Sequence, residues 1–240
     1  MAGVTLVWVA DLPESAEEWY EDEYIPAMLS QHAKGVLLGE ENDTGLDPEE
    51  SGAETKEAEW KSLAFYDVED VQKAKEATYD EKNHPPTIKE QIKNARFDVR
   101  SYDQLRRWQN DPDWNGDAAD IQSILLWEWK PREGFEKEVL DFYENELGPM
   151  FSTSPEILRL RWFKLKDATV LKGDTYQTLE KEELFTYMVA AELDNEACPW
   201  DQMFAMYDMP GWVKYYEAQK CVKWQARHYI IKRNYEHDSK

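Results

Sequence analysis

The chain has 240 residues, a length that suits one large domain or two modules of about 110 residues each. Its 28 Lys and Arg residues face 50 Asp and Glu residues, and the resulting formal charge of −22 disfavours nucleic acid and anionic membranes as partners. Two cysteines imply no disulfide framework and favour a reducing compartment.

The first part of the chain alternates short β-branched or aromatic runs with polar segments that suit helices. Residues 4–10 predict a strand, and not a signal peptide, because no basic segment precedes them. A capping box from Ser15 to Glu18 predicts the start of a helix that Pro26 interrupts. The other elements expected here are strands at 33–38, 60–66 and 95–102, a helix at 67–82 and an acidic loop at 40–58.

The second part predicts the same order of elements after a linker at 108–119. The expected elements are strands at 121–129, 157–164, 184–193 and 223–232, a helix at 134–146 and a helical stretch after Trp200. In both parts the order is β-α-β-β-α-β, which is the ferredoxin-like split unit.

A repeated motif supports this division. Residues 19–26 read WYEDEYIP, and residues 142–149, which lie 123 positions later, read FYENELGP. The closing segments echo one another as well, with Ala95-Arg96 matched by Ala226-Arg227. We therefore predict an α+β fold of two tandem ferredoxin-like repeats, residues 1–107 and 120–240. Their antiparallel sheets would face each other in a pseudo-dimeric α/β barrel with the helices outside.

The segment Trp19-Tyr20-x-x-Glu23-x-Ile25-Pro26 resembles the Trp-Tyr-x-x-Glu-His-x-Pro segment of tandem dimeric α/β-barrel proteins of the EthD-like kind, which are common in fungal secondary metabolism. The resemblance extends over most of both halves and includes Pro210-Gly211-Trp212. It implies the barrel fold and several roles, from polyketide cyclisation, isomerisation and lyase chemistry to haem-dependent or cofactor-free oxidation. The family histidine is replaced by Tyr24 and Leu147, so neither repeat can use it.

The candidate catalytic residues are those that could hold or move a proton. A carboxylate among aromatic rings, as expected at Glu23 and Glu146, can have a raised pKa, although both could equally bond the backbone at a helix end. Alternation places His228 on the strand face opposite Tyr229. The resemblance adds weight to His84, because small cofactor-free barrels often use a histidine near that position with a tyrosine partner. The candidates are His84, His228, Glu23, Tyr20, His32, Tyr143 and Glu146.

Aromatic side chains on the expected strands and first helix are candidates for lining a cavity. Aromatic walls around a few polar groups are typical of a site for a hydrophobic small molecule, and they are equally typical of a filled core. Trp127 and Trp129 share one strand face. The candidates for substrate binding are Trp8, Tyr24, Tyr66, Trp127, Trp129, Trp162 and Tyr187.

The chain has no phosphate-binding loop, dinucleotide fingerprint or Gly-x-Ser-x-Gly elbow, and its histidines and cysteines lack metal-ligand spacing. We predict a cytoplasmic monomer or homodimer that needs no metal or cofactor. It would be a cyclase, isomerase, dehydratase or lyase, acting by acid–base chemistry on a hydrophobic polyketide- or terpenoid-like molecule in an aromatic-lined barrel cavity. The alternatives are a non-catalytic small-molecule-binding or stress-type barrel, and a cofactor-free or haem-dependent oxygenase.

Overall fold

The computed structural model describes residues 1–42, 61–79, 82, 95–172, 175–178 and 184–236. Its strands follow the predicted order, with one added strand, β7 (Thr175–Thr178). In the first half they are β1 (Gly3–Ala10), β2 (Ala33–Asn42), β3 (Ser62–Val68) and β4 (Arg96–Trp108). In the second half they are β5 (Ser123–Pro131), β6 (Ile157–Lys172), β7 (Thr175–Thr178), β8 (Tyr187–Leu193) and β9 (Val222–Glu236).

The sheet closes on itself. Its nine described strands pair in the order β4-β1-β3-β2-β9-β5-β8-β6-β7, and β4 pairs with β6 as well, so eight strands form a ring and β7 extends from β6. Each half contributes four strands in the same relative order, β4-β1-β3-β2 and β9-β5-β8-β6, and the halves join at β2–β9 and β4–β6. The predicted α+β pseudo-dimeric barrel is confirmed.

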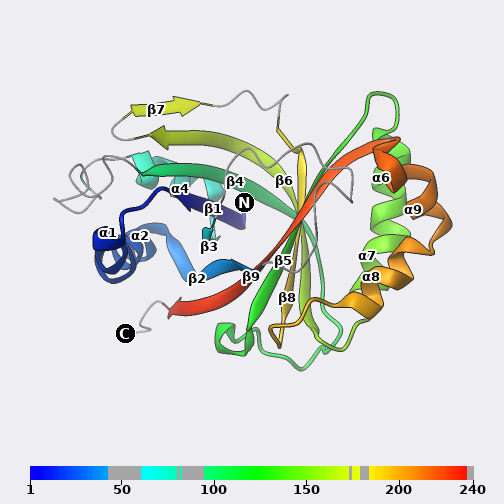
Figure 1. Ribbon diagram of the computed structural model, residues 1–240, viewed down its shortest axis with the longest axis horizontal. Helices are drawn as coiled ribbons and strands as arrows, with labels where there is room; N and C mark the ends of the chain where they lie inside the picture. Colours follow the sequence, from blue (N-terminus) through cyan, green and yellow to red (C-terminus); the bar gives the residue numbers. More distant parts are fainter. Residues whose placement is uncertain (43–60, 80–81, 83–94, 173–174, 179–183, 237–240) are drawn as a thin grey trace.

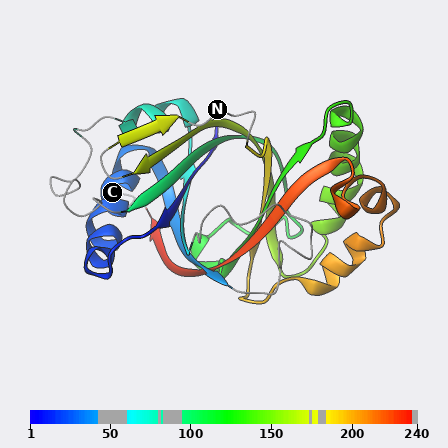
Figure 2. The ribbon, with the colours of Figure 1, turned by 45° about the horizontal axis from the view of Figure 1, so that its top comes forward.

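The helices cover the outside of the barrel in two groups on opposite sides (Figures 1 and 2). The first half contributes α1 (Glu14–Trp19), η1 (Tyr20–Tyr24), α2 (Ile25–His32) and α4 (Val71–Tyr79). The second half contributes α6 (Glu136–Phe142), η4 (Tyr143–Leu147), α7 (Gly148–Phe151), α8 (Trp200–Tyr207) and α9 (Pro210–Tyr215). Two short 3-10 turns are η3 (Ala118–Asp120) and η6 (Glu217–Gln219). None of the described helices is long and apolar enough to cross a membrane.

The repeated motif forms a π-helical turn in both halves. In η1 the N–H of Ile25 donates to the carbonyl of Tyr20, and in η4 the N–H of Gly148 donates to the carbonyl of Tyr143. The prediction that Pro26 interrupts the helix was wrong, because Pro26 is the second residue of α2. At the start of a helical segment the missing N–H of proline costs little.

Other differences concern helix caps and strand ends. The predicted capping box was wrong, since Ser15 lies within α1 and the N-cap is Pro13. β4 continues to Trp108, in the predicted linker, because it pairs with β6 as far as Leu160. The first residues of the predicted acidic loop belong to β2, and 43–58 lie outside the described residues. The division of the chain at 108–119 stays a prediction.

Side chains fill the barrel interior. Alternation along the strands sends one set of residues inward and the other toward the helices. The inward set from both halves forms one buried cluster that includes Leu6, Trp8, Phe65, Phe163 and Tyr229. Two further clusters lie between the sheet and each helix group. The interior is therefore a core and not the cavity that the sequence predicts.

Buried ion pairs cross this interior from one half to the other. Arg100 of β4 donates to Glu128 of β5, with Nη1 and Oε1 2.9 Å apart. Arg161 of β6 donates to Asp67 of β3 at 2.9 Å and to Glu192 of β8. Because buried charges are stable only when paired, these contacts hold the two halves in one relative position.

Replacing Glu192 by Gln tests this arrangement. Glu192 is fully buried and accepts bonds from Arg159 and Arg161, so its loss leaves the largely buried Arg159 without its carboxylate partner and Arg161 with Asp67 alone. We expect the free energy of unfolding to fall by about 3–5 kcal/mol, measured by urea denaturation. Asp141→Asn, which breaks the exposed pair with Lys137, should cost less than about 1 kcal/mol. Equal losses in the two variants would contradict the structural role of the interior pairs.

Candidate functional site

A pocket of about 900 Å³ lies at the joint of the two halves, where β1 and β2 end, β3 begins and β9 passes. We name it the rim pocket. It is lined by residues 9–12, 38, 40–42, 61–62 and 225–228, with Glu14, Glu17, Tyr20, Glu21 and Lys232. This volume falls within the range of small-molecule sites. Helix residues, strand ends and the middle of β9 meet here because β2 stops at Asn42, opposite His228.

Negative charge dominates the rim pocket. Six carboxylates line it against three basic side chains. Lys232 is already paired, with its Nζ 2.9 Å from an oxygen of Glu21 and 3.1 Å from one of Glu40. Arg227 Nη1 lies 3.9 Å from Glu41 Oε1, too far for a hydrogen bond. Within the described ranges, no three His, Cys, Asp or Glu side chains come together as a metal site.

Three lining residues carry buried polar atoms that have no hydrogen-bond partner among the residues that the structure describes. They are Tyr20 Oη, Arg227 Nη1 and His228 Nε2. Leaving a buried donor or acceptor unsatisfied costs about 1–3 kcal/mol, so most buried polar atoms in folded proteins have a hydrogen-bond partner. Arg227 and His228 are neighbours on β9, so their side chains leave opposite faces of the strand, and a ligand at the rim could supply separate acceptors for them but not one shared atom.

His228 is a neutral imidazole at pH 7. It is 1% exposed, and burial lowers its pKa to about 4. The amide nitrogen of Asn42 faces Nδ1 at 3.4 Å, and an N–H can donate only to an unprotonated nitrogen, which places the imidazole proton on Nε2. As alternation predicts, His228 lies on the face of β9 opposite Tyr229, which points into the barrel. His228 can therefore donate a hydrogen bond without carrying charge.

Tyr20 reaches the rim pocket from the π-helical turn. Its ring stacks on that of Tyr24, with centroids 5.5 Å apart. Burial, followed by the neighbouring Tyr24 and Tyr235, raises the pKa of Tyr20 well above its usual value, so the hydroxyl keeps its proton and can donate. The hydroxyls of Tyr66 and Tyr235, in the same layer, also have no partner.

Of the predicted catalytic residues that the structure describes, only Tyr20 and His228 line the rim pocket. Glu23 and Glu146 are exposed on the two π-helical turns, and Glu146 borders a separate groove of about 480 Å³ near α9. His32, at the end of α2, lies beside the ring of Tyr66 at 6.1 Å. The remaining candidates are Tyr143, which is buried under the helices of the second half, and His84, which lies outside the described residues.

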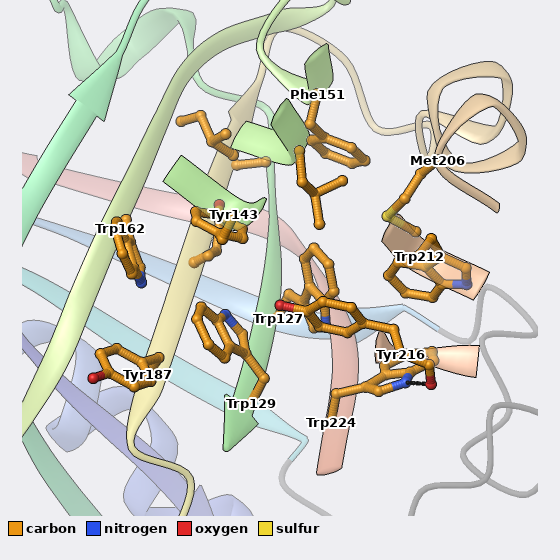
Figure 3. Close-up of a cluster of buried hydrophobic side chains, with 14 of the residues drawn as sticks. Trp127, Trp129, Tyr143, Phe151, Trp162, Tyr187, Met206, Trp212, Tyr216 and Trp224 are labelled. Atoms are coloured by element: carbon orange, nitrogen blue, oxygen red, sulfur yellow. Dashed lines mark hydrogen bonds between the residues drawn. The ribbon is translucent and has the colours of Figure 1, made fainter. Parts of the chain in front are cut away.

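Most predicted substrate-binding aromatics form a packed layer in the second half, between its strands and its helices (Figure 3). Trp129 stacks on Tyr187 at 4.6 Å and on Trp162 at 6.1 Å, and Trp127 shares its strand face. The layer encloses a cavity of only about 20 Å³, too small for a polyketide. The other predicted residues are Trp8, inside the barrel, and Tyr24 and Tyr66, in the first helix layer.

Among the lining residues of the rim pocket that sequence reasoning missed are Glu41, Asn42 and Arg227. Glu41 and Asn42 belong to the acidic stretch that predicts a loop, whereas pairing with β9 continues β2 through both. In the sequence, Arg227 stands out only as the second residue of Ala226-Arg227, which repeats Ala95-Arg96. The repeat was a usable signal, because an arginine kept in the closing strand of both halves needs a buried acceptor or a ligand.

No family model matches the chain, and no curated protein matches it in sequence. Among solved structures it is similar to an anthrone oxidase-like protein (12% identity, TM-score 0.57, covering 99% of this chain and 94% of that one). It is also similar to a protein from Fusobacterium nucleatum that is proposed to be a monooxygenase (8% identity, TM-score 0.56, covering 98% of this chain and 94% of that one). A third similar structure is a proposed monooxygenase from Lactobacillus acidophilus (6% identity, TM-score 0.55, covering 98% of this chain and 97% of that one). At these identities the similarity shows a shared fold, and the EthD-like resemblance stays a prediction.

The lowered pKa of His228 predicts how stability depends on pH. In the unfolded chain the imidazole binds a proton below its usual value of 6.5, but in the folded chain only near 4. Between these values the unfolded state binds more protons, so acid favours unfolding. We expect the free energy of unfolding to fall from pH 6.5 to 4, by about 1–3 kcal/mol from this residue.

Urea denaturation at several pH values would measure this fall, and His228→Gln should reduce it. His32, whose pKa is also lowered to about 4 by burial, provides the matched variant His32→Gln, which should remove a separate part of the same dependence. An NMR titration in which His228 has a midpoint near 6.5 would show that the imidazole is not buried as described.

Proposed function

We propose that the chain is a cofactor-independent enzyme that binds a small, partly apolar carbonyl or phenol compound in the rim pocket and removes a proton near its oxygen. The observation that carries the proposal is the buried donor Nη1 of Arg227, which has no hydrogen-bond acceptor among the described residues and lies 3.9 Å from Glu41 Oε1. A cationic donor beside a carboxylate suits a ligand oxygen that gains negative charge during the reaction. Tyr20 and His228 line the pocket from the helix side of the sheet and do not share this oxygen.

The lining of the rim pocket supports an uncharged substrate. Val9, Leu38 and Ala226 offer apolar contact, whereas acidic side chains such as Glu14 and Glu17 surround the pocket. A phosphate or carboxylate would meet this excess negative charge and bind poorly. A neutral molecule with an apolar body and one polar oxygen fits both features.

Each residue has a distinct role in this proposal. Arg227 Nη1 donates to the substrate oxygen, and the Glu41 carboxylate, which shares the inner face of the sheet with Arg227, accepts the proton. His228, on the other face of β9, borders the pocket as a neutral donor. The C–H bond breaks, its electron pair passes to the oxygen as an enolate, and Glu41 becomes protonated. Return of the proton to another carbon gives isomerisation, and attack of the enolate carbon on a second carbonyl gives cyclisation. The EthD-like resemblance favours a polyketide-like substrate for this chemistry.

Anthrone is a suitable first probe. It is neutral and largely apolar, it carries a ketone and an acidic C–H, and the name of one structurally similar protein refers to it. Exchange of its C–H for deuterium, followed by NMR in D₂O under nitrogen, measures proton removal without any later step. Related phenolic ketones and 1,3-diketones would extend the panel.

Glu41→Gln should slow exchange about 10²-fold or more through loss of the base, and Arg227→Met should do so through loss of the oxyanion donor. Glu40→Gln is the matched control, because Glu40 lines the same pocket but is paired with Lys232, and it should exchange at the rate of the unaltered protein. Unchanged rates in both Glu41→Gln and Arg227→Met would reject the assignment.

The same panel separates the alternatives. Binding to the rim pocket without exchange would indicate a non-catalytic small-molecule barrel. Exchange accompanied by oxygen consumption in air would indicate a cofactor-free oxygenase, in which the enolate is the oxygen-reactive species.

A further inference from the structure

The small cavity in the second half has an apolar wall. We name it the apolar chamber. It lies between strands β5, β8 and β9 on one side and helices α8 and α9 on the other (Figure 3). Its volume is about 20 Å³, and about 10–15 Å³ is enough for one water-sized molecule. The residues on which the argument rests are Trp127, Ala191, Met203, Met206, Trp212 and Ala226.

Aromatic contacts keep the apolar chamber open. The ring centroids of Trp127 and Trp212 are 5.4 Å apart, those of Trp212 and Trp224 are 5.4 Å apart, and those of Trp127 and Trp224 are 6.2 Å apart. Trp224 is fixed further by its Nε1, which donates to the carbonyl of Tyr216 (Figure 3). Because each of these three indole rings packs against the other two, none can move into the space without losing contacts, and the void persists.

Water is a poor occupant of this space. A buried water normally makes two to four hydrogen bonds, and the wall of the apolar chamber has no polar surface. Its side chains are hydrocarbon, thioether and indole, and none of them carries an oxygen. Apolar cavities of this kind stay dry and take up small apolar molecules.

We propose that the apolar chamber is a binding site for a small apolar gas, dioxygen. Its size admits a diatomic molecule, and its lining offers dispersion contacts without hydrogen bonds. Its position adds a reason for dioxygen, because Ala226 lines both the apolar chamber and the rim pocket. The two spaces therefore border the same residue of β9. Reaction of this dioxygen with an enolate rests on the proposed function, whereas binding of dioxygen in the apolar chamber does not.

Methionine methyl groups provide the test in the intact protein. Met203 and Met206 line the apolar chamber, whereas Met188 is equally buried inside the barrel. With methyl-labelled methionine, paramagnetic dioxygen dissolved under pressure should relax the Met203 and Met206 methyls several times faster than that of Met188. Equal enhancement at all three methyls would overturn the proposal, because it would reflect general penetration and not a site.

A variant whose larger side chain fills the apolar chamber provides a second test of dioxygen binding. Ala191→Val places a larger side chain in the space, and relaxation of the Met203 and Met206 methyls should fall to the level of Met188. Ala190→Val, one residue earlier on β8 but facing the barrel interior, should leave the enhancement unchanged. If Ala191→Val does not fold, Ala226→Val fills the same space from β9. Enhancement that persists in a folded, filled variant would overturn the proposal.

The two proposals fail separately. Deuterium exchange under nitrogen tests the rim pocket without any gas, and methyl relaxation under dioxygen tests the apolar chamber without any substrate. Loss of the relaxation effect with exchange intact would remove only the gas site.

Discussion

The joining of β2 to β9 and of β4 to β6 is the constraint on which the rest of the structure depends. A four-stranded sheet alone would leave one face and two edges uncovered, and closure with the other half removes both problems. Closure also buries Arg100 and Arg161, which find acceptors across the joints in Glu128 and Asp67. Because the interior is filled in this way, the pockets found among the described residues lie at the rim and on the helix side of the second half.

The two helix layers have diverged from a common plan. Tyr20 and Tyr143 occupy matching positions in the repeated π-helical turn, and both are buried. Tyr20 borders the rim pocket, whereas Tyr143 packs on Trp162 at 4.9 Å. The second layer is so tight that a Cβ on Gly211 would lie 2.1 Å from the ring of Phe142. The helix layer of the second half is thus filled by aromatic rings, whereas that of the first half borders an open pocket to which β9 of the second half also contributes.

Burial and charge act together at the rim pocket. His228 stays neutral because desolvation penalises its charged form, and the neutral ring leaves a donor on Nε2. The surrounding carboxylates favour neutral ligands, so selection by charge and stabilisation by hydrogen bonds come from different residues. The apolar chamber differs in kind, since its wall selects by size and lack of polarity.

The sequence by itself determined the element order and the doubling of the fold, because strand and helix periodicity and a motif repeated after 123 residues are local properties. It also placed Tyr20 and His228 among the candidates. The tertiary structure alone decided that Trp127 and Trp129 fill a layer and do not line a large cavity, and that Glu41 and Arg227 meet at a pocket. Local pattern states which face of a strand a residue occupies. What covers that face depends on contacts between segments far apart in the chain.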